Sequence, residues 1–229
     1  FLKYNSSSSV IPNNGSKVRA YYMELQDNYG QISSDRNYSK QATIYVRASN
    51  VRDAPINQFN DLQRIRLIEQ QLKPLLEKLR GDFSREEYLN RKLSKFLDKW
   101  NFFLGRDFKK EGLTKPRIIL KVILEELKAR YGFKAFESTT FYDNFEVLFN
   151  TETIKFPRGH GLGMANALTT LMQYTILKMG INRALSEYPS AEYEFFAEND
   201  DMILGFNDES FMEAWWTADE DITNELDLI

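Results

Sequence analysis

Residues 194–206 read Glu194-Phe195-Phe196-Ala197-Glu198-Asn199-Asp200-Asp201-Met202-Ile203-Leu204-Gly205-Phe206. Two apolar runs flank a polar tip, a pattern typical of a β-hairpin whose turn carries adjacent carboxylates. Because side chains alternate across a strand, Asp200 and Asp201 point in different directions unless the turn reorients one of them. Asn and Asp also favour tight turns for backbone reasons alone, so the upstream sequence must decide between a site and a simple turn.

The composition is that of a packed globular chain. The 229 residues are 42% hydrophobic, enough for one sizeable core with a flanking subdomain. The sequence contains no run of eighteen apolar residues, so it predicts no membrane segment. The absence of Cys excludes disulfides, thiolate zinc sites and Cys nucleophiles, and the single His160 leaves little room for His-based metal sites. The chain begins at Phe1, and we expect it to be a piece of a longer protein.

Charge is divided unevenly along the chain. Residues 1–135 hold 26 Lys and Arg against 15 Asp and Glu, a net +11, whereas residues 136–229 hold 4 against 18, a net −14. A basic half suggests an anionic partner such as a nucleic acid or nucleotide. An acidic half with paired carboxylates suggests bound cations. The alternative is that two solvated faces simply differ in sign.

Two segments near the N-terminus, residues 18–25 and 42–48, have strand-like composition, and we expect residues 26–41 between them to form a long loop. An extended hairpin of this kind would present cations to phosphates. Alternatively, the same cations protect a solvated sheet edge. The cations on or beside the two segments are Lys17, Arg19, Lys40, Arg47 and Arg52.

Two amphipathic helices follow. Apolar residues recur at intervals of three and four from residue 59, which predicts a helix that Pro74 kinks or interrupts and Gly81 ends. Ser84 and Glu87 form a capping box for a second helix. The predicted apolar face of that helix consists of Tyr88, Leu89, Leu93, Phe96, Leu97 and Trp100.

A short buried strand, residues 101–104, is predicted to deliver Asp107 at its end. We expect residues 108–114 to form a loop and a helix to begin at Thr114 and Pro116 and end at Gly132. An Asp between a buried strand and a helix is well placed to line a site, although turn chemistry also favours Asp there. The predicted apolar face of the helix consists of Ile118, Ile119, Val122, Ile123 and Leu127.

A glycine-rich loop comes after a predicted strand at residues 145–149. Gly159, Gly161 and Gly163 alternate with other residues, a composition that lets a ligand approach the backbone. The G-x-G-x-G spacing is neither a dinucleotide fingerprint nor a P-loop. A long helix is predicted after the loop, and the hairpin is expected to be followed by a short helix at 209–217. We expect the acidic tail at 219–229 to be frayed or in contact with missing sequence. The core face predicted for the long helix consists of Leu168, Leu171, Met172, Thr175, Ile176 and Met179.

The order of these features resembles motifs A, B and C of the right-hand palm domain in viral RNA-dependent RNA polymerases. Asp107 stands for motif A, the loop at Gly161 for motif B and Asp200 for motif C, at intervals of 54 and 39 residues. The resemblance covers roughly residues 101–216, and the basic hairpin before it resembles motif F of the fingers. Motif C usually reads Gly-Asp-Asp, and the Asn199-Asp200-Asp201 form is similar to divergent lineages, including ormycovirus-like ones.

The resemblance implies an α+β fold, with an antiparallel palm sheet backed by helices and a helical and β-hairpin portion of the fingers. Residues 1–100 would be the fingers portion and residues 101–229 the palm with motifs A, B and C. The thumb would be absent from this chain and supplied by missing sequence or by a second polypeptide.

The resemblance also implies a chemistry. Asp107, Asp200 and Asp201 would be the catalytic residues and would hold Mg²⁺, with Mn²⁺ as an alternative. Arg47 and Arg52 would clamp the incoming triphosphate, with Lys40, Lys17 and Arg19 as alternatives. The usual second Asp of motif A is replaced by Gly112, next to Glu111. The remaining nucleotide-binding residues would be Glu111, Gly161, Gly163 and Asn166, of which Asn166 would contact the ribose hydroxyls.

The implied enzyme is an RNA-directed RNA polymerase that replicates a viral genome in the host cytoplasm, with an RNA template, a product strand and NTPs as its partners. A reverse transcriptase is one alternative, but its usual Pro-Gln-Gly and Ser-Pro sequences are missing here. A non-catalytic RNA-binding module would bind RNA without Mg²⁺. An inactive polymerase fragment is the third alternative.

Overall fold

The computed structural model describes residues 37–47, 50–57, 59–80, 86–108, 111–132, 145–149, 151–159, 166–198 and 201–228. Over these residues the chain is α+β, as the sequence predicts. It divides into two compact units, the first made of residues 1–71 and 110–165 and the second of residues 72–109 and 166–229. Within the described ranges, no helix combines the length and hydropathy needed to cross a bilayer. The predicted fingers–palm boundary at residue 100 stays a prediction.

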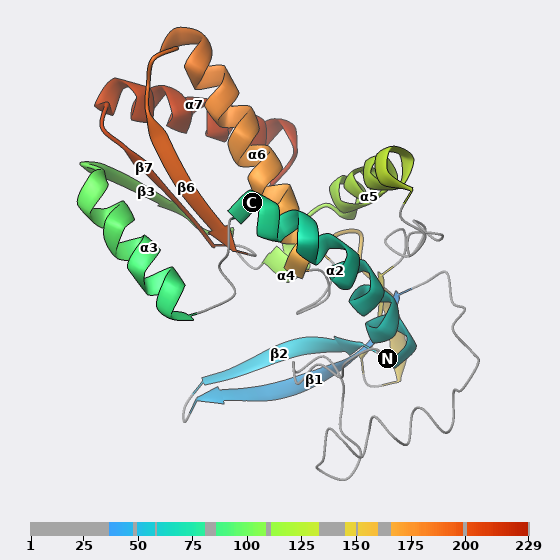
Figure 1. Ribbon diagram of the computed structural model, residues 1–229. Coiled ribbons are helices and arrows are strands. Elements are labelled where there is room, and N and C mark those ends of the chain that lie inside the picture. The colour runs from blue at the N-terminus through green and yellow to red at the C-terminus, as the bar shows by residue number, and fades with distance from the viewer. Residues whose placement is uncertain are drawn as a thin grey trace. The chain divides into compact units, whose positions relative to one another are not determined.

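The first unit contains a four-stranded sheet in the order β2-β1-β4-β5. Strands β1 (Asn37–Arg47) and β2 (Asn50–Asn57) form a long antiparallel hairpin, visible in Figure 1. Strand β4 (Phe145–Phe149) runs parallel to β1, and β5 (Glu152–Lys155) runs antiparallel to β4. The helices of this unit are α4 (Glu111–Thr114), α5 (Arg117–Tyr131) and the first part of α2 (Phe59–Arg80).

Only the second segment of the predicted basic hairpin lies within the described residues. Residues 37–41, predicted in a loop, belong to β1, which pairs with the segment directly after it. The predicted partner, residues 18–25, lies outside the described residues. A connection of two residues closes a far shorter loop than residues 26–41 would, at a lower cost in chain entropy. Pro55 is tolerated in β2 because β2 is an edge strand.

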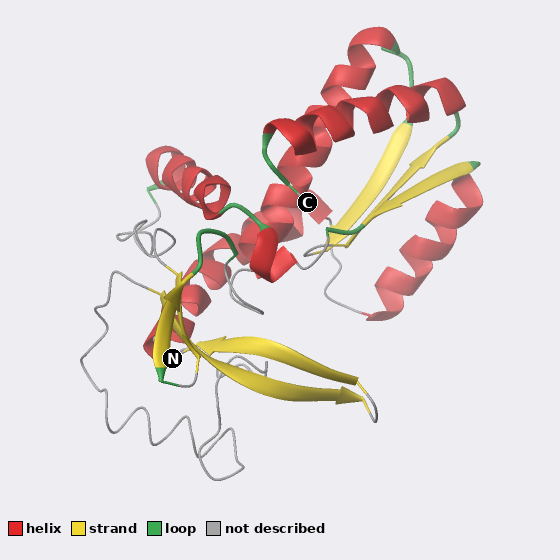
Figure 2. Ribbon diagram, turned by 180° about the vertical axis from the view of Figure 1, so that it is seen from behind, coloured by secondary structure: helices red, strands yellow, loops and turns green. Residues whose placement is uncertain are grey.

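The second unit contains a three-stranded antiparallel sheet in the order β3-β7-β6. These strands are β3 (Phe102–Arg106), β6 (Tyr193–Glu198) and β7 (Asp201–Phe206). The predicted hairpin at 194–206 is confirmed as β6 and β7. Helices α6 (Asn166–Glu187) and α7 (Glu209–Glu225) cover one face of the sheet, and α3 (Glu86–Lys99) lies on the other, as Figures 1 and 2 show.

The main core of this unit lies between the sheet and the α6–α7 pair. Alternate residues of β7 enter it, and aromatic residues of α7 fill the space below them. On the opposite face, Gly205 leaves room for α3, because a Cβ there would lie 2.6 Å from Trp100 Cδ1 and 2.9 Å from Phe96 Cζ. The buried core residues are Tyr174, Leu177, Ile181, Ala184, Ala197, Met202, Leu204, Phe206, Phe211 and Trp215.

Predictions about helices α2 and α5 are correct only in part. Helix α2 is not interrupted at Pro74, because the loss of one backbone hydrogen bond is outweighed by burial of residues such as Leu72 and Leu76. The alternative, a kink at Pro74, stays a prediction. In α5, Ile118 and Val122 of the predicted core face are 61% and 49% exposed. Leu127 of the predicted face is buried, and the other buried apolar residues of the helix are Leu120 and Leu124. Gly132 ends this helix as predicted, with a φ of 62°.

The predicted apolar faces of α3 and α6 are correct only in part. In α3, Phe96 and Trp100 are buried, but Leu93 and Leu97 are exposed because the helix contacts the narrow sheet mainly around Gly205. In α6, Leu168, Met172 and Ile176 of the predicted face are buried, whereas Thr175 and Met179 are exposed.

Three further segments differ from expectation. Residues 111–114 form the short helix α4 rather than a loop. Strand β3 alternates between half-buried and exposed residues rather than being buried, because it is an edge strand. Helix α7 continues to Glu225, so the predicted frayed tail is wrong, and Ile222 within it is fully buried.

Candidate active site

Two predicted acidic residues meet at one end of the three-stranded sheet. The last residue of β3, Arg106, pairs with Met202 of β7. Continuing this antiparallel register by one residue places Asp107 opposite Asp201. Both residues are exposed. On the other side of β7, Asp201 pairs with Glu198. The start of β7 therefore lies beside the end of β3. The predicted closeness of Asp107 to Asp200 stays a prediction, because Asp200 lies outside the described residues.

The alternation of side chains gives both acids the same face. Met202, Leu204 and Phe206 are buried toward α6 and α7. Asp201 is one residue before Met202 and therefore lies on the opposite face. Arg106 points toward the helices, since it contacts α6 and α7, and the next residue, Asp107, continues on the Asp201 face.

Asn166, the predicted ribose contact, is the first residue of α6 and belongs to the same unit. Gln173 contacts Arg106 at the acidic end of the sheet, whereas Lys178 contacts Tyr193 at the far end. The helix therefore runs from the acidic end toward the far end, and Asn166 lies roughly 10 Å along the axis before Gln173. The backbone oxygen of Asn166 accepts hydrogen bonds from the Thr169 and Thr170 hydroxyls, and the residue itself is exposed.

A buried cation supports the end of β3 from behind. Arg106 forms an ion pair with Asp219 of α7, and its Nη2 donates to Gln173 Oε1 of α6 at 2.8 Å. The guanidinium also lies 4.7 Å from the centre of the Phe108 ring. Burial raises the pKa of Asp219, and the neighbouring Arg106 opposes this increase.

Sequence reasoning missed this group because it assigned Asp219 to a frayed tail. A signal was available, since Phe211, Trp215, Ala218 and Ile222 continue one helical face beyond residue 217. No signal in a single sequence pairs Arg106 with Asp219.

The described start of the glycine-rich loop, Arg158 and Gly159, is held by hydrogen bonds within the first unit. Gly159 has a φ of 80°, and its N–H donates to the Lys115 oxygen at 2.8 Å. Arg117 is buried and donates to the oxygens of Gly159 at 2.8 Å and Phe156 at 2.7 Å. Arg158 Nε donates to the Thr114 oxygen. These contacts join the start of the loop to the segment that precedes α5, and sequence reasoning missed Arg117.

The remaining predicted site residues are not brought to the acidic end by described geometry. Arg47 and Arg52 lie on β1 and β2, where they pair with Asn50 and Ile44, and Glu111 begins α4. All three belong to the first unit. Three other predicted residues, Asp200, Gly161 and Gly163, lie outside the described residues.

The donor set at the acidic end suits a hard cation. Carboxylate oxygens are the ligands that Mg²⁺ and Mn²⁺ prefer, and Asp107 and Asp201 offer them on one exposed face. Within the described part of the chain, no group of three or more His, Cys, Asp or Glu side chains is arranged to hold a metal ion. The described geometry thus supplies two carboxylates.

No protein family matches the chain, and no curated protein is significantly similar to it.

Proposed function

We propose that this chain carries the palm and part of the fingers of a viral RNA-dependent RNA polymerase. The observation that carries the proposal is the β3–β7 register, which aligns Asp107 with Asp201 on one face of the sheet. A turn-forming role would explain Asp201 alone, but it does not explain why a second exposed acid from a distant segment ends its strand directly opposite.

The order of the elements supports the same function. The chain presents an acid after β3, then a glycine-rich loop that leads into the long helix α6, then the acidic hairpin β6–β7. Asp107, Asn166 and Asp201 belong to one compact unit whose antiparallel sheet is backed by two helices. This is the arrangement expected for motifs A, B and C of a right-hand palm.

Each residue has a defined task in the proposed reaction, the template-directed transfer of a nucleotide from an NTP to an RNA 3′-hydroxyl. Two Mg²⁺ ions, when bound, activate the hydroxyl and neutralise the pyrophosphate, and Asp107, Asp200 and Asp201 would hold them. Asn166 would donate to and accept from the ribose hydroxyls, which distinguish RNA from DNA precursors. Arg47 and Arg52 would bind the triphosphate.

The test is Mg²⁺-dependent incorporation of ribonucleotides on an RNA template by the full chain and its Asp107→Asn variant. We expect the variant to lose about 100-fold or more in rate, because an amide is a much weaker ligand for Mg²⁺ than a carboxylate. Asp98→Asn is the matched control, since Asp98 is an exposed acid of α3 in the same unit and should not affect the rate.

Equal rates for wild type and Asp107→Asn would overturn the proposal. Incorporation of deoxyribonucleotides in preference to ribonucleotides would favour a reverse transcriptase instead. RNA binding that needs no Mg²⁺ and survives Asp200→Ala, without any incorporation, would favour a binding module.

A further inference from the structure

We propose that Arg106 is a positioning residue for the acidic site. By its ion pair with Asp219 and its hydrogen bond to Gln173, it holds the end of β3 in the register that aligns Asp107 with Asp201. This inference rests on the proposed function, because it assigns Arg106 a role in assembling the same metal-binding face.

The first observation is the position of Arg106 in the sheet. Arg106 is the last paired residue of β3 and directly precedes Asp107. Its partners come from α6 and α7, 67 and 113 residues further along the chain. Both ends of the ion pair are nearly closed to solvent, with side-chain exposures of 10% for Arg106 and 6% for Asp219. One side chain therefore ties the end of β3 to both helices behind the sheet.

The second observation is that Asp107 is held from both sides. Arg106 before it and Phe108 after it contact each other, with the guanidinium 4.7 Å from the ring centre, and Phe108 is only 6% exposed. Asp107 between them is exposed. With both neighbours fixed behind the sheet, the carboxylate of Asp107 has few directions other than the open face.

The third observation is that the other contacts of β3 specify its register only weakly. It is a five-residue edge strand that pairs only with β7 among the described strands, and its Gly105 offers no side chain for packing. A slip of one residue would place Arg106 or Phe108 opposite Asp201 and turn Asp107 to the other face. The apolar residues Phe102 and Leu104 are only half-buried and so specify the register weakly.

Stability alone does not account for this ion pair. Removing two charges from water offsets most of their attraction, so buried pairs commonly contribute little to folding and are best attested as devices that fix register. Burial raises the pKa of Asp219 despite the adjacent guanidinium, which agrees with a large desolvation cost for this pair. The Arg106–Asp219 pair is therefore better explained by its effect on the register of β3 than by a contribution to folding stability.

The test replaces the pair by apolar residues of similar size in the full chain, with the double variant Arg106→Met/Asp219→Leu. This variant leaves no uncompensated buried charge, so it should fold and unfold thermally near the wild-type temperature. We expect Mn²⁺ binding, measured directly by electron paramagnetic resonance, to weaken about tenfold or more. The kcat for ribonucleotide incorporation should fall by a similar factor, with a smaller change in KM for the NTP.

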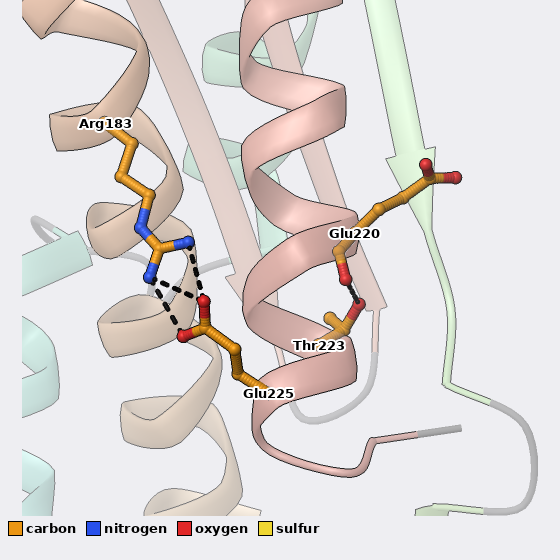
Figure 3. Close-up of polar contacts among 4 residues, drawn as sticks. All are labelled: Arg183, Glu220, Thr223 and Glu225. Atoms are coloured by element: carbon orange, nitrogen blue, oxygen red, sulfur yellow. Dashed lines mark hydrogen bonds and ion pairs between the residues drawn. The ribbon is translucent and has the colours of Figure 1, made fainter.

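The matched control is an ion pair between α6 and α7 that does not involve β3. Figure 3 shows Arg183 of α6 contacting Glu225 of α7, with Nη2 and Oε2 3.0 Å apart and side-chain exposures of 42% and 60%. The variant Arg183→Met/Glu225→Leu removes an α6–α7 contact of equal charge that does not reach β3. It should leave Mn²⁺ binding and kcat at wild-type levels.

Two single variants keep the inference falsifiable if the double variant does not fold. Asp219→Asn retains an oxygen that accepts from Arg106, so it should keep most of the Mn²⁺ affinity. Gln173→Met removes the other partner of Arg106 and should weaken Mn²⁺ binding. Wild-type Mn²⁺ affinity in either Gln173→Met or a folded double variant would overturn the positioning role. A wild type that binds no Mn²⁺ would instead overturn the proposed function itself.

Discussion

The two ends of the three-stranded sheet are built for different purposes. At one end, Phe206 packs against Phe211 and Trp215, with ring centroids 5.5 and 6.2 Å apart, and α3 closes over Gly205 from the other face. At the other end, Asp107 and Asp201 are exposed on the open face, and the charged Arg106 lies behind them. The first end is a packed apolar core, whereas a buried ion pair, Arg106–Asp219, lies behind the second. We therefore expect substitutions at the first end to affect mainly stability and substitutions at the second to affect mainly function.

At the packed end, the substitution Trp215→Ala should cause the largest loss of stability. Trp215 is fully buried against Phe206, and its removal should lower the free energy of unfolding by about 3–5 kcal/mol. Trp216→Ala is the matched control: Trp216 is 44% exposed, so its removal should cost less than about 1 kcal/mol. Urea unfolding followed by circular dichroism measures both, and equal losses would contradict the packing described for this end.

The acidic end should respond in the opposite way. Asp201→Asn should reduce Mg²⁺-dependent incorporation by about 100-fold while leaving thermal unfolding close to wild type, because the residue is exposed. Measuring the incorporation rate and the unfolding temperature of the same variant distinguishes a catalytic role of Asp201 from a structural one. A large loss of stability in this variant would mean that Asp201 serves the hairpin rather than the site.

The same substitution at two glycines, one near each end of the sheet, compares the packing of the two ends. Gly205→Ala would bring a methyl group within 2.6 Å of Trp100 and should cost about 1–3 kcal/mol by overpacking. Gly105→Ala, near the acidic end, meets only the Met202 oxygen at 3.7 Å and should be tolerated. Chemical unfolding of both variants provides the measurement, and a larger loss for Gly105→Ala than for Gly205→Ala would contradict the tight packing described at Gly205.

The smallest expected effect concerns pH. Burial raises the folded-state pKa of Asp219 above 3.8, so the folded chain binds this proton more tightly than the unfolded chain. Its contribution to stability is therefore complete below the unfolded pKa and is lost as pH rises through the folded pKa. The difference in unfolding free energy between wild type and Asp219→Asn should shift against the wild type as pH is raised from acidic to neutral. A shift in favour of the wild type would mean that attraction to Arg106 outweighs burial.

Much of the acidic end could be predicted from sequence because its signals are local. The apolar runs on either side of residues 199–201 identify the hairpin, and the strand before Asp107 identifies where that acid emerges. The buried face of α5 could not be predicted, because Ile118–Leu120 and Val122–Leu124 are apolar in succession and the period does not select one side. Either stripe fits a helix, and only the tertiary contacts choose Leu120 and Leu124.

The anchor behind the site could not be predicted for a different reason. Arg106 and Asp219 are 113 residues apart, and each alone is a charged residue in an otherwise ordinary segment. The run of acids at 219–221 is typical of a solvated tail, which concealed the helical face that continues through Ala218 and Ile222. Ion pairs between distant segments depend on the register of the sheet and the placement of both helices, neither of which is a local property.

The pairing of β3 with β7 also fixes when the two acids can meet during synthesis. Asp201 follows Asp107 by 94 residues in the chain. A ribosome that adds about 5–20 residues per second needs roughly 5–20 s to make that interval, and the carboxylates cannot be aligned before it has passed. The growing polypeptide thus carries its first acid without the second throughout this interval, and the pair is completed only when β7 joins the sheet.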